Sequence, residues 1–166
     1  MTPQSRQQRL VTLFAACGAL IFGCVLAATW AVQAATTERV VTDRHTGLAI
    51  SGFDPVAYFT DAVPRLGMSD FELASSGVTW RFRNEGNMAA FAADPEIYAP
   101  QFGGYDPVGV ARGVATAGHP QVFVIHAKRL YLFQSAQTRE QFTADPDAVH
   151  MSALEKWPDV QHDLIP

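Results

Sequence analysis

Cysteine is scarce in this chain, and its placement excludes several kinds of chemistry. The two cysteines, Cys17 and Cys24, both lie in an uncharged N-terminal block. Because they are seven residues apart, they would share one face of a helix, and we interpret them as small apolar fillers. Residues 35–166 therefore contain no cysteine, which excludes a disulfide, a thiol nucleophile and a thiolate metal site from that part of the chain.

Charge is missing from residues 10–32, a run of 23 residues that follows Arg6 and Arg9. As a helix this run would be about 34 Å long, enough to cross the hydrocarbon core of a bilayer. Arginines before such a run stay in the cytoplasm, so the rest of the chain is expected on the outer side. The length favours a membrane anchor, whereas small residues around Val32-Gln33-Ala34 favour cleavage of a signal peptide. Both alternatives make residues 1–34 a targeting segment and predict a periplasmic or extracytoplasmic location at the inner membrane.

Basic clusters are also lacking, which excludes one class of partner. From Ala35 onward the sequence has 10 Lys and Arg residues against 16 Asp and Glu residues, a net charge of −6. Nucleic-acid binding would require a patch of positive charge, so we expect no nucleic acid among the partners. The partners we expect are an unknown protein or a small ligand, and the membrane itself if the N-terminal helix is retained.

Familiar catalytic and metal-binding motifs do not occur. The sequence has no Gly-x-Ser-x-Gly and no His-Glu-x-x-His, and no two histidines have i, i+4 spacing. We therefore expect no catalytic residue, no metal ligand set and no cofactor, and we interpret the histidines as solvated or hydrogen-bonded side chains. Two alternatives stay open. One is a copper or iron site in which Asp106 meets His126 or His45 in space, and the other is an enzyme of unknown reaction.

An internal repeat is the main positive feature of the sequence. Residues 52–57, Gly-Phe-Asp-Pro-Val-Ala, match residues 104–109, Gly-Tyr-Asp-Pro-Val-Gly, at an offset of 52. A second block matches at an offset of 51, in which Phe82, Phe91, Asp94 and Pro95 correspond to Phe133, Phe142, Asp145 and Pro146. Two blocks in the same order at nearly the same offset indicate a duplication.

Each half is predicted to be a β-hairpin followed by a helix. The apolar residues of 78–82 alternate with polar ones, which is typical of a strand with one buried face, and a turn is expected at residues 75–77. In the second half we expect strands over residues 122–125 and 130–133. The residues that bound the helices are expected to be the N-caps Asn84 and Ser135 and the pairs Asp94-Pro95 and Asp145-Pro146. The four repeated phenylalanines should be buried.

The repeated residues resemble the YHS domain family, in which an Asp-Pro-Val opening precedes a hairpin, an aromatic strand end and a helix with Phe, Pro and Tyr. The first half offers Asp54-Pro55-Val56-Ala57-Tyr58-Phe59, Trp80-Arg81-Phe82, Phe91, Asp94-Pro95 and Tyr98. The second half offers Asp106-Pro107-Val108, Tyr131-Leu132-Phe133, Phe142 and Asp145-Pro146. The resemblance covers about residues 48–157, and residues 50–59 are especially close to exported bacterial members.

The same resemblance implies a degenerate metal site. Metal-binding members carry cysteines just after Asp-Pro-Val and around the start of the helix. At those places this chain has Ala57, Arg83 and Asn87 in the first half, and Gly109, Gln134 and Thr138 in the second. None of these is a good ligand for a soft metal, and Asp106 stands where some exported members have Cys or selenocysteine. The resemblance thus implies the fold without the metal or redox chemistry.

The sequence as a whole predicts an α+β fold, with two YHS-like hairpin–helix units packed as one domain after an N-terminal hydrophobic helix. We expect a linker over 35–47, the domain over 48–157 with halves of about 48–100 and 101–157, and a tail over 158–166. The expected function is that of a non-enzymatic binding or accessory module whose site lies at the junction of the halves. The candidate ligand-binding residues are Phe53, Tyr58, Tyr105, Asp106 and His126.

Overall fold

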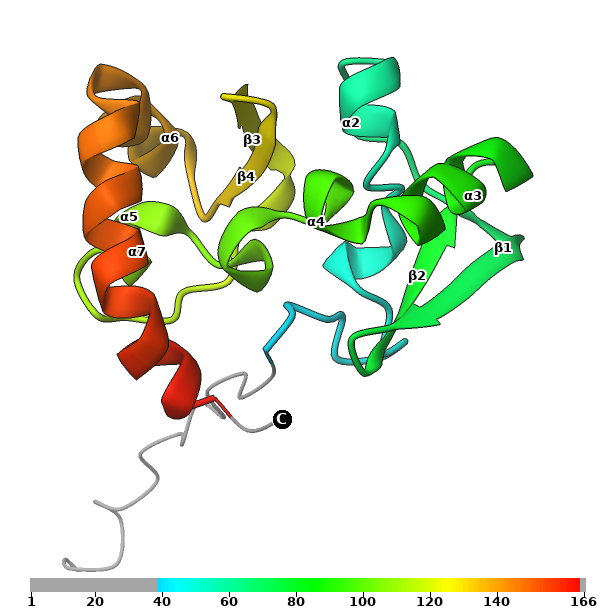
Figure 1. The fold of residues 1–166 in the computed structure, drawn as a ribbon, viewed down its shortest axis with the longest axis horizontal. Coiled ribbons are helices and arrows are strands. Elements are labelled where there is room, and N and C mark those ends of the chain that lie inside the picture. The colour runs from blue at the N-terminus through cyan, green and yellow to red at the C-terminus, as the bar shows by residue number, and fades with distance from the viewer. Residues whose placement is uncertain (1–38, 165–166) are drawn as a thin grey trace, which may run out of the picture. The chain divides into compact units, whose positions relative to one another are not determined.

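The computed structural model describes residues 39–164, which form two small antiparallel sheets with helices around them (Figure 1). The first half contains, in chain order, η2 (Ile50–Gly52), α2 (Ala57–Thr60), β1 (Met68–Ser75), β2 (Val78–Phe82), α3 (Glu85–Ala93) and α4 (Pro95–Tyr98). The second half contains η3 (Gln101–Gly104), α5 (Pro107–Val110), β3 (His119–His126), β4 (Arg129–Phe133), α6 (Ala136–Ala144) and α7 (Pro146–His162). The α+β class expected from the sequence is confirmed.

The duplication inferred from the sequence is visible in the backbone. The two hairpins and the helices α3 and α6 correspond at an offset of 51, and both hairpins have a register shift at the same place in their first strand. Outside the strands, Asp54 N donates to Arg65 O and Asp106 N donates to Thr116 O, each at 2.8 Å. The halves are therefore two copies of one local plan.

Two-residue turns close both hairpins. Ser76 and Gly77 have φ of 54° and 79°, and Ala127 and Lys128 have φ of 47° and 59°. Two central residues with positive φ give the turn whose twist matches that of the flanking strands. The turn expected near residues 75–77 and the connection expected between the strands of the second half are both confirmed.

Side-chain caps fix the starts of the longer helices. Asn84 Oδ1 accepts from Asn87 N at 2.8 Å, and Ser135 forms a capping box with Thr138. Asp145 Oδ1 accepts from Ala148 N at 3.1 Å. Asp94 separates α3 from α4, as predicted. Its side chain, however, accepts no capping hydrogen bond from α4.

The core consists of two aromatic clusters built to the same pattern. In the first half the ring of Phe91 lies 4.9 Å from that of Trp80 and 5.3 Å from that of Phe82. In the second half the ring of Phe142 lies 4.7 Å from that of Tyr131 and 5.2 Å from that of Phe133. The four repeated phenylalanines are at most 1% exposed, as the sequence predicts.

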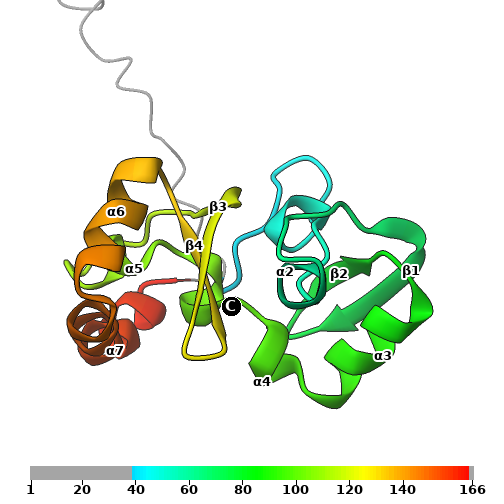
Figure 2. The same ribbon diagram turned by 90° about the horizontal axis from the view of Figure 1, so that it is seen from above.

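Strand β4 joins the two halves because it is buried on both faces. Tyr131 and Phe133 pack into the cluster of the second half, whereas Leu130 and Leu132 pack into that of the first. Figure 2 shows the β3–β4 hairpin between α6 on one side and α2 on the other. The second hairpin thus supplies both cores, and this shared strand packs the halves together.

The N-terminal boundary of the domain differs from the expected linker over 35–47. Val41 is buried, its N–H donates to Gly103 O at 2.8 Å, and its carbonyl accepts from Ile50 N at 2.9 Å. Thr42 also forms a β-bridge with Ala49. Since Val41 buries an apolar side chain and pairs its backbone, the domain begins at least at this residue.

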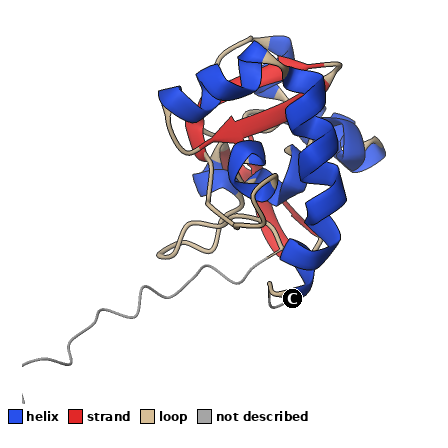
Figure 3. Cartoon of the chain, turned by 90° about the vertical axis from the view of Figure 1, so that its left-hand side faces the viewer, coloured by secondary structure: helices blue, strands red, loops and turns tan. Residues whose placement is uncertain are grey.

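The C-terminal boundary also lies beyond the one expected. Helix α7 continues through Pro158 to His162, and Figure 3 shows a helix running down to the C-terminus. Val160 and Leu164 are buried. A proline inside a helix removes one i→i−4 hydrogen bond. Burial of the two apolar side chains offsets that loss, so residues 158–164 belong to the domain rather than to a tail.

Within residues 39–164, none of the helices is both long and apolar enough to cross a bilayer. The N-terminal hydrophobic helix expected over residues 10–32 lies outside the described residues.

Candidate functional sites

A buried aspartate stands at the centre of the first half. The Asp54 side chain is fully buried. Its Oδ1 accepts from Val56 N at 2.8 Å and from Ala57 N at 3.3 Å. Its Oδ2 accepts from Arg83 N at 2.8 Å and from Asn87 Nδ2 at 2.6 Å. This carboxylate therefore ties the opening turn to the junction between β2 and α3.

Asp106 takes the same place in the second half with fewer donors. It is 1% exposed, and its Oδ1 accepts from Val108 N at 2.9 Å. Its Oδ2 accepts from Gln134 N at 2.9 Å. Gln134 corresponds to Arg83 in the repeat, so the backbone bond between hairpin end and aspartate is conserved between the halves of this chain.

The positions that the family resemblance assigns to cysteine come together around these aspartates. In the first half all three of them, Ala57, Arg83 and Asn87, donate hydrogen bonds to Asp54. In the second half all three of their counterparts line one small cavity with Asp106. No thiolate or imidazole is present at any of these six positions, so the residues do not fit a soft metal ion.

The cavity at Asp106 has a volume of about 170 Å³. Its lining includes Val108, Gly109, Arg112, Val114, Thr116, Gln134 and Thr138. Arg112 also donates from Nη2 to Gln141 Oε1 at 3.2 Å, so its guanidinium is held against α6. The residues around the cavity therefore include a buried aspartate, an arginine and two threonines as well as apolar side chains.

A larger groove lies at the junction of the halves. It has a volume of about 750 Å³, within the usual range for small-molecule sites. The N-terminal segment, the first hairpin turn, the segment between the halves and α7 all contribute to it, through residues that include Arg39, Val40, Gly77, Gly103, Trp157 and Gln161. Sequence reasoning placed a site at this junction but did not identify these residues.

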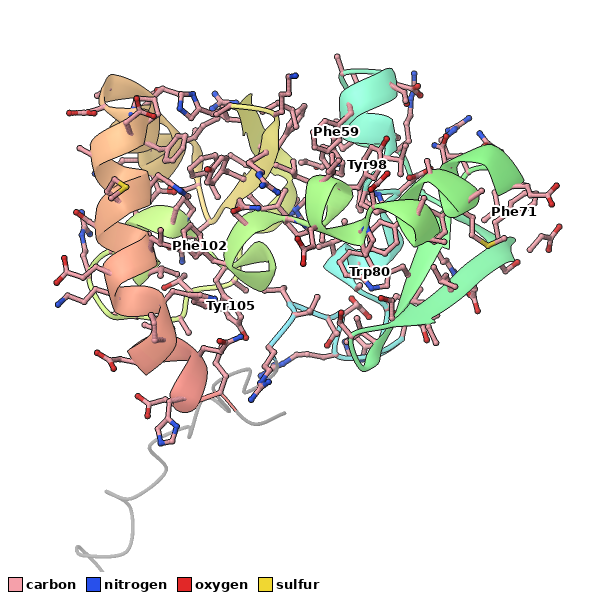
Figure 4. All side chains as sticks on the ribbon, in the orientation of Figure 1. Phe59, Phe71, Trp80, Tyr98, Phe102 and Tyr105 are labelled. Atoms are coloured by element: carbon pink, nitrogen blue, oxygen red, sulfur yellow. The ribbon has the colours of Figure 1, made fainter. Side chains whose placement is uncertain are left out.

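Trp157 forms an aromatic wall of this groove. Its ring lies 5.6 Å from that of Phe102 and 6.2 Å from that of Tyr105, and Figure 4 shows both labelled side chains on the α7 side of the connecting segment. Trp157 is half-buried, while Phe102 and Tyr105 are buried. The wall therefore rests on packed core side chains, which hold it in place.

The candidate aromatic residues from the sequence are packing residues in the structure. Tyr58 is 1% exposed, its OH donates to Pro120 O at 2.7 Å, and its ring meets that of Phe123 edge-on at 4.9 Å. Burial raises the pKa of Tyr58, and the neighbouring Asp54 carboxylate adds to this rise. Phe53 is half-buried and pairs with Leu66 in an isolated β-bridge. Tyr105 belongs to the cluster of the other half, so these candidates do not share one pocket.

His126 lies apart from the other candidates, at the end of β3. Its Nε2 is 2.8 Å from Asp147 Oδ1, at the start of α7. Close by, Tyr131 OH is 3.1 Å from His150 Nδ1. Burial raises the pKa of Tyr131, with Arg129 opposing and Asp147 adding to the rise. The two histidine contacts fasten the second hairpin to α7, which is a structural role.

Among residues 39–164, no three His, Cys, Asp or Glu side chains are placed so that they could hold a metal ion. The structure does not bring Asp106 together with His126 or His45 in such a group. His45 lies in an exposed turn, where its N–H donates to Asp43 Oδ1 at 3.0 Å.

Comparison with protein-family models, with curated proteins and with solved structures gives no match for this chain.

Proposed function

We propose that this protein is an extracytoplasmic binding module of the YHS type rather than an enzyme, and that it binds its ligand in the groove at the junction of the halves. The observation that carries the proposal is the groove itself, about 750 Å³ in volume and lined by residues from both halves. Support for the YHS assignment comes from the duplicated hairpin–helix plan around two buried aspartates. Support for export comes from the uncharged run after Arg6 and Arg9.

The lining of the groove favours a particular ligand chemistry. Trp157 offers an aromatic surface, and Arg39 offers a guanidinium that binds carboxylates well. Backbone at Gly77 has no side chain to block a close approach, and the space beside it is open. A small organic molecule with a flat apolar part and a carboxylate fits this combination, as does a protruding segment of a partner protein with the same groups.

Site-specific photo-crosslinking tests the proposal in cells that express the full chain. A benzophenone amino acid is placed at residue 161 in the groove, or at residue 155 on the exposed side of the same helix as a matched control. We expect a discrete adduct at residue 161, seen as a shifted band for a protein partner or as an intact-mass increase for a small ligand. Position 155 should give none.

A second variant distinguishes binding in the groove from non-specific crosslinking. Arg39 is exposed, so Arg39→Ala should leave the fold intact while weakening the adduct at residue 161 several-fold. Equal adducts at residues 161 and 155, or an adduct at 161 that does not respond to Arg39→Ala, would contradict the proposed site.

A further inference from the structure

The two buried aspartates differ in how far their acceptor capacity is used. A carboxylate offers about four lone-pair positions for hydrogen bonds. Asp54 receives four donors, and the last is the side-chain amide of Asn87. Asp106 receives the backbone donors Val108 N and Gln134 N, although it is just as deeply buried. A buried carboxylate with unused acceptor positions is stabilised by any further donor that reaches it.

The side-chain donor that Asp54 receives from Asn87 has no counterpart at Asp106. Thr138 corresponds to Asn87 at the offset of 51, and both are the third residue of a helix with an extended N-cap. The Thr138 hydroxyl turns back to the helix start, where it accepts from Ser135 N at 3.3 Å and donates to Ser135 O at 3.1 Å. The side chain is thus engaged in the cap and is shorter than asparagine, and the cavity lies beside it.

We propose that the cavity at Asp106 binds a small neutral molecule with a primary amide, such as a carboxamide or a urea. Its NH₂ group donates to the Asp106 carboxylate in the way that the Asn87 amide donates to Asp54. A volume of about 170 Å³ corresponds to about six waters, at roughly 30 Å³ each, or to an organic molecule of similar size. This site shares no lining residue with the junction groove, so a negative result at one site does not contradict the proposal for the other.

Arg112 decides between a neutral amide and a cation. Arg112 is one of the residues that line the cavity, and its positive charge disfavours an ammonium ion, which the Asp106 carboxylate alone would attract. A guanidinium has five N–H donors, so Arg112 can donate to the carbonyl oxygen of the ligand and still reach Gln141. A primary amide therefore finds an acceptor for its NH₂ and a donor for its C=O in one cavity.

Acetamide is the probe for this site. Added to ¹⁵N-labelled full chain in detergent, it should cause saturable amide shifts at Gly109, Gln134 and Thr138. N,N-dimethylacetamide, which has no N–H, should cause none of these shifts, and ammonium should bind at least tenfold more weakly. Two variants should each weaken acetamide binding at least tenfold. Thr138→Asn supplies the missing amide from within the chain, and Val114→Phe blocks the cavity from a position that is 55% exposed, where the fold tolerates change.

Three results would overturn the proposal. Equal shifts with acetamide and dimethylacetamide would show that the cavity recognises no N–H donor and holds water only. Unchanged acetamide binding in Thr138→Asn and Val114→Phe would place the binding elsewhere. Tighter binding of ammonium than of acetamide would assign the site to cations.

Discussion

The four donors around Asp54 lead us to expect a large loss of stability when it is replaced by asparagine. Asparagine has nearly the same shape as aspartate, but it presents one oxygen and one NH₂ group. At Asp54 each carboxylate oxygen accepts two hydrogen bonds. In Asp54→Asn at least one backbone donor must face an NH₂ group, because only the Asn87 amide can turn its own oxygen toward that group. The three other hydrogen bonds lose their charged acceptor. At Asp106 each oxygen accepts one of the hydrogen bonds described above, so Asp106→Asn leaves one donor in that position.

The expected magnitudes follow from the cost of a buried donor without a partner, about 1–3 kcal/mol. Asp54→Asn should lower the free energy of unfolding by roughly 2–6 kcal/mol, because one backbone donor loses its acceptor and three further hydrogen bonds lose a charged one. This is a large part of the stability of an ordinary domain. Asp106→Asn should lower it by roughly 1–3 kcal/mol, because the displaced donor also lies beside a cavity that water can enter.

Urea unfolding of the full chain in detergent, followed by far-UV circular dichroism, measures both variants. The two substitutions are the same chemical change at equivalent positions of the repeat, so each is the control for the other. An Asp106→Asn loss equal to or greater than that of Asp54→Asn would refute the hydrogen-bond reasoning, because it would show that the number of donors does not set the cost.

Four further outcomes are expected. Tyr58 has a raised pKa, so the folded state keeps a proton that the unfolded state loses above about pH 10. The free energy of unfolding should therefore fall above that pH, by up to about 1.4 kcal/mol per pH unit. A pH series of urea melts measures this fall, and Tyr58→Phe should make it smaller. Asn87→Thr should destabilise the domain by about 1–3 kcal/mol in the same melts, because it removes the donor to Asp54 Oδ2. A reporter fused after residue 166 should be active outside the cytoplasm, and a reporter active inside it would contradict the predicted orientation. Dialysed full chain should contain well under one equivalent of zinc or copper(I), and a chelator should leave its melting temperature unchanged; a stoichiometric metal that resists dialysis would contradict the degenerate-site interpretation.

Local signals in the sequence predict most of the fold. Alternation along residues 78–82 marks a strand, and the N-caps Asn84 and Ser135 mark the helix starts because their side chains satisfy backbone N–H groups near at hand. The repeat adds long-range information, since burial of one phenylalanine of a pair implies burial of its partner. These features depend on residues within one half, which is why a single sequence suffices for them.

The features that the sequence does not predict depend on contacts between halves. Leu130 and Leu132 alternate like any strand residues, and only the folded chain shows that their face packs into the other core. The helix beyond Pro158 is also a tertiary effect, because burial of Val160 outweighs a local helix breaker. The same holds for the groove, whose walls come from four segments far apart in the chain.

Most residues of the two aspartate sites can be identified from the sequence alone. The two buried aspartates and the six positions around them are found by aligning the repeat with itself. That alignment also shows asparagine at residue 87 against threonine at residue 138. Its consequence, a filled position in one half and a cavity in the other, required the structure because it depends on which way the threonine hydroxyl turns.

The central claim is that two copies of one plan differ in whether a side chain closes the aspartate site. The most direct test is an exchange, Asn87→Thr together with Thr138→Asn, examined by the same acetamide titration of the labelled full chain. We expect the saturable shifts to move from Gly109 and Gln134 to their counterparts Ala57 and Arg83. Shifts that stay at Gly109 and Gln134 after the exchange would contradict it.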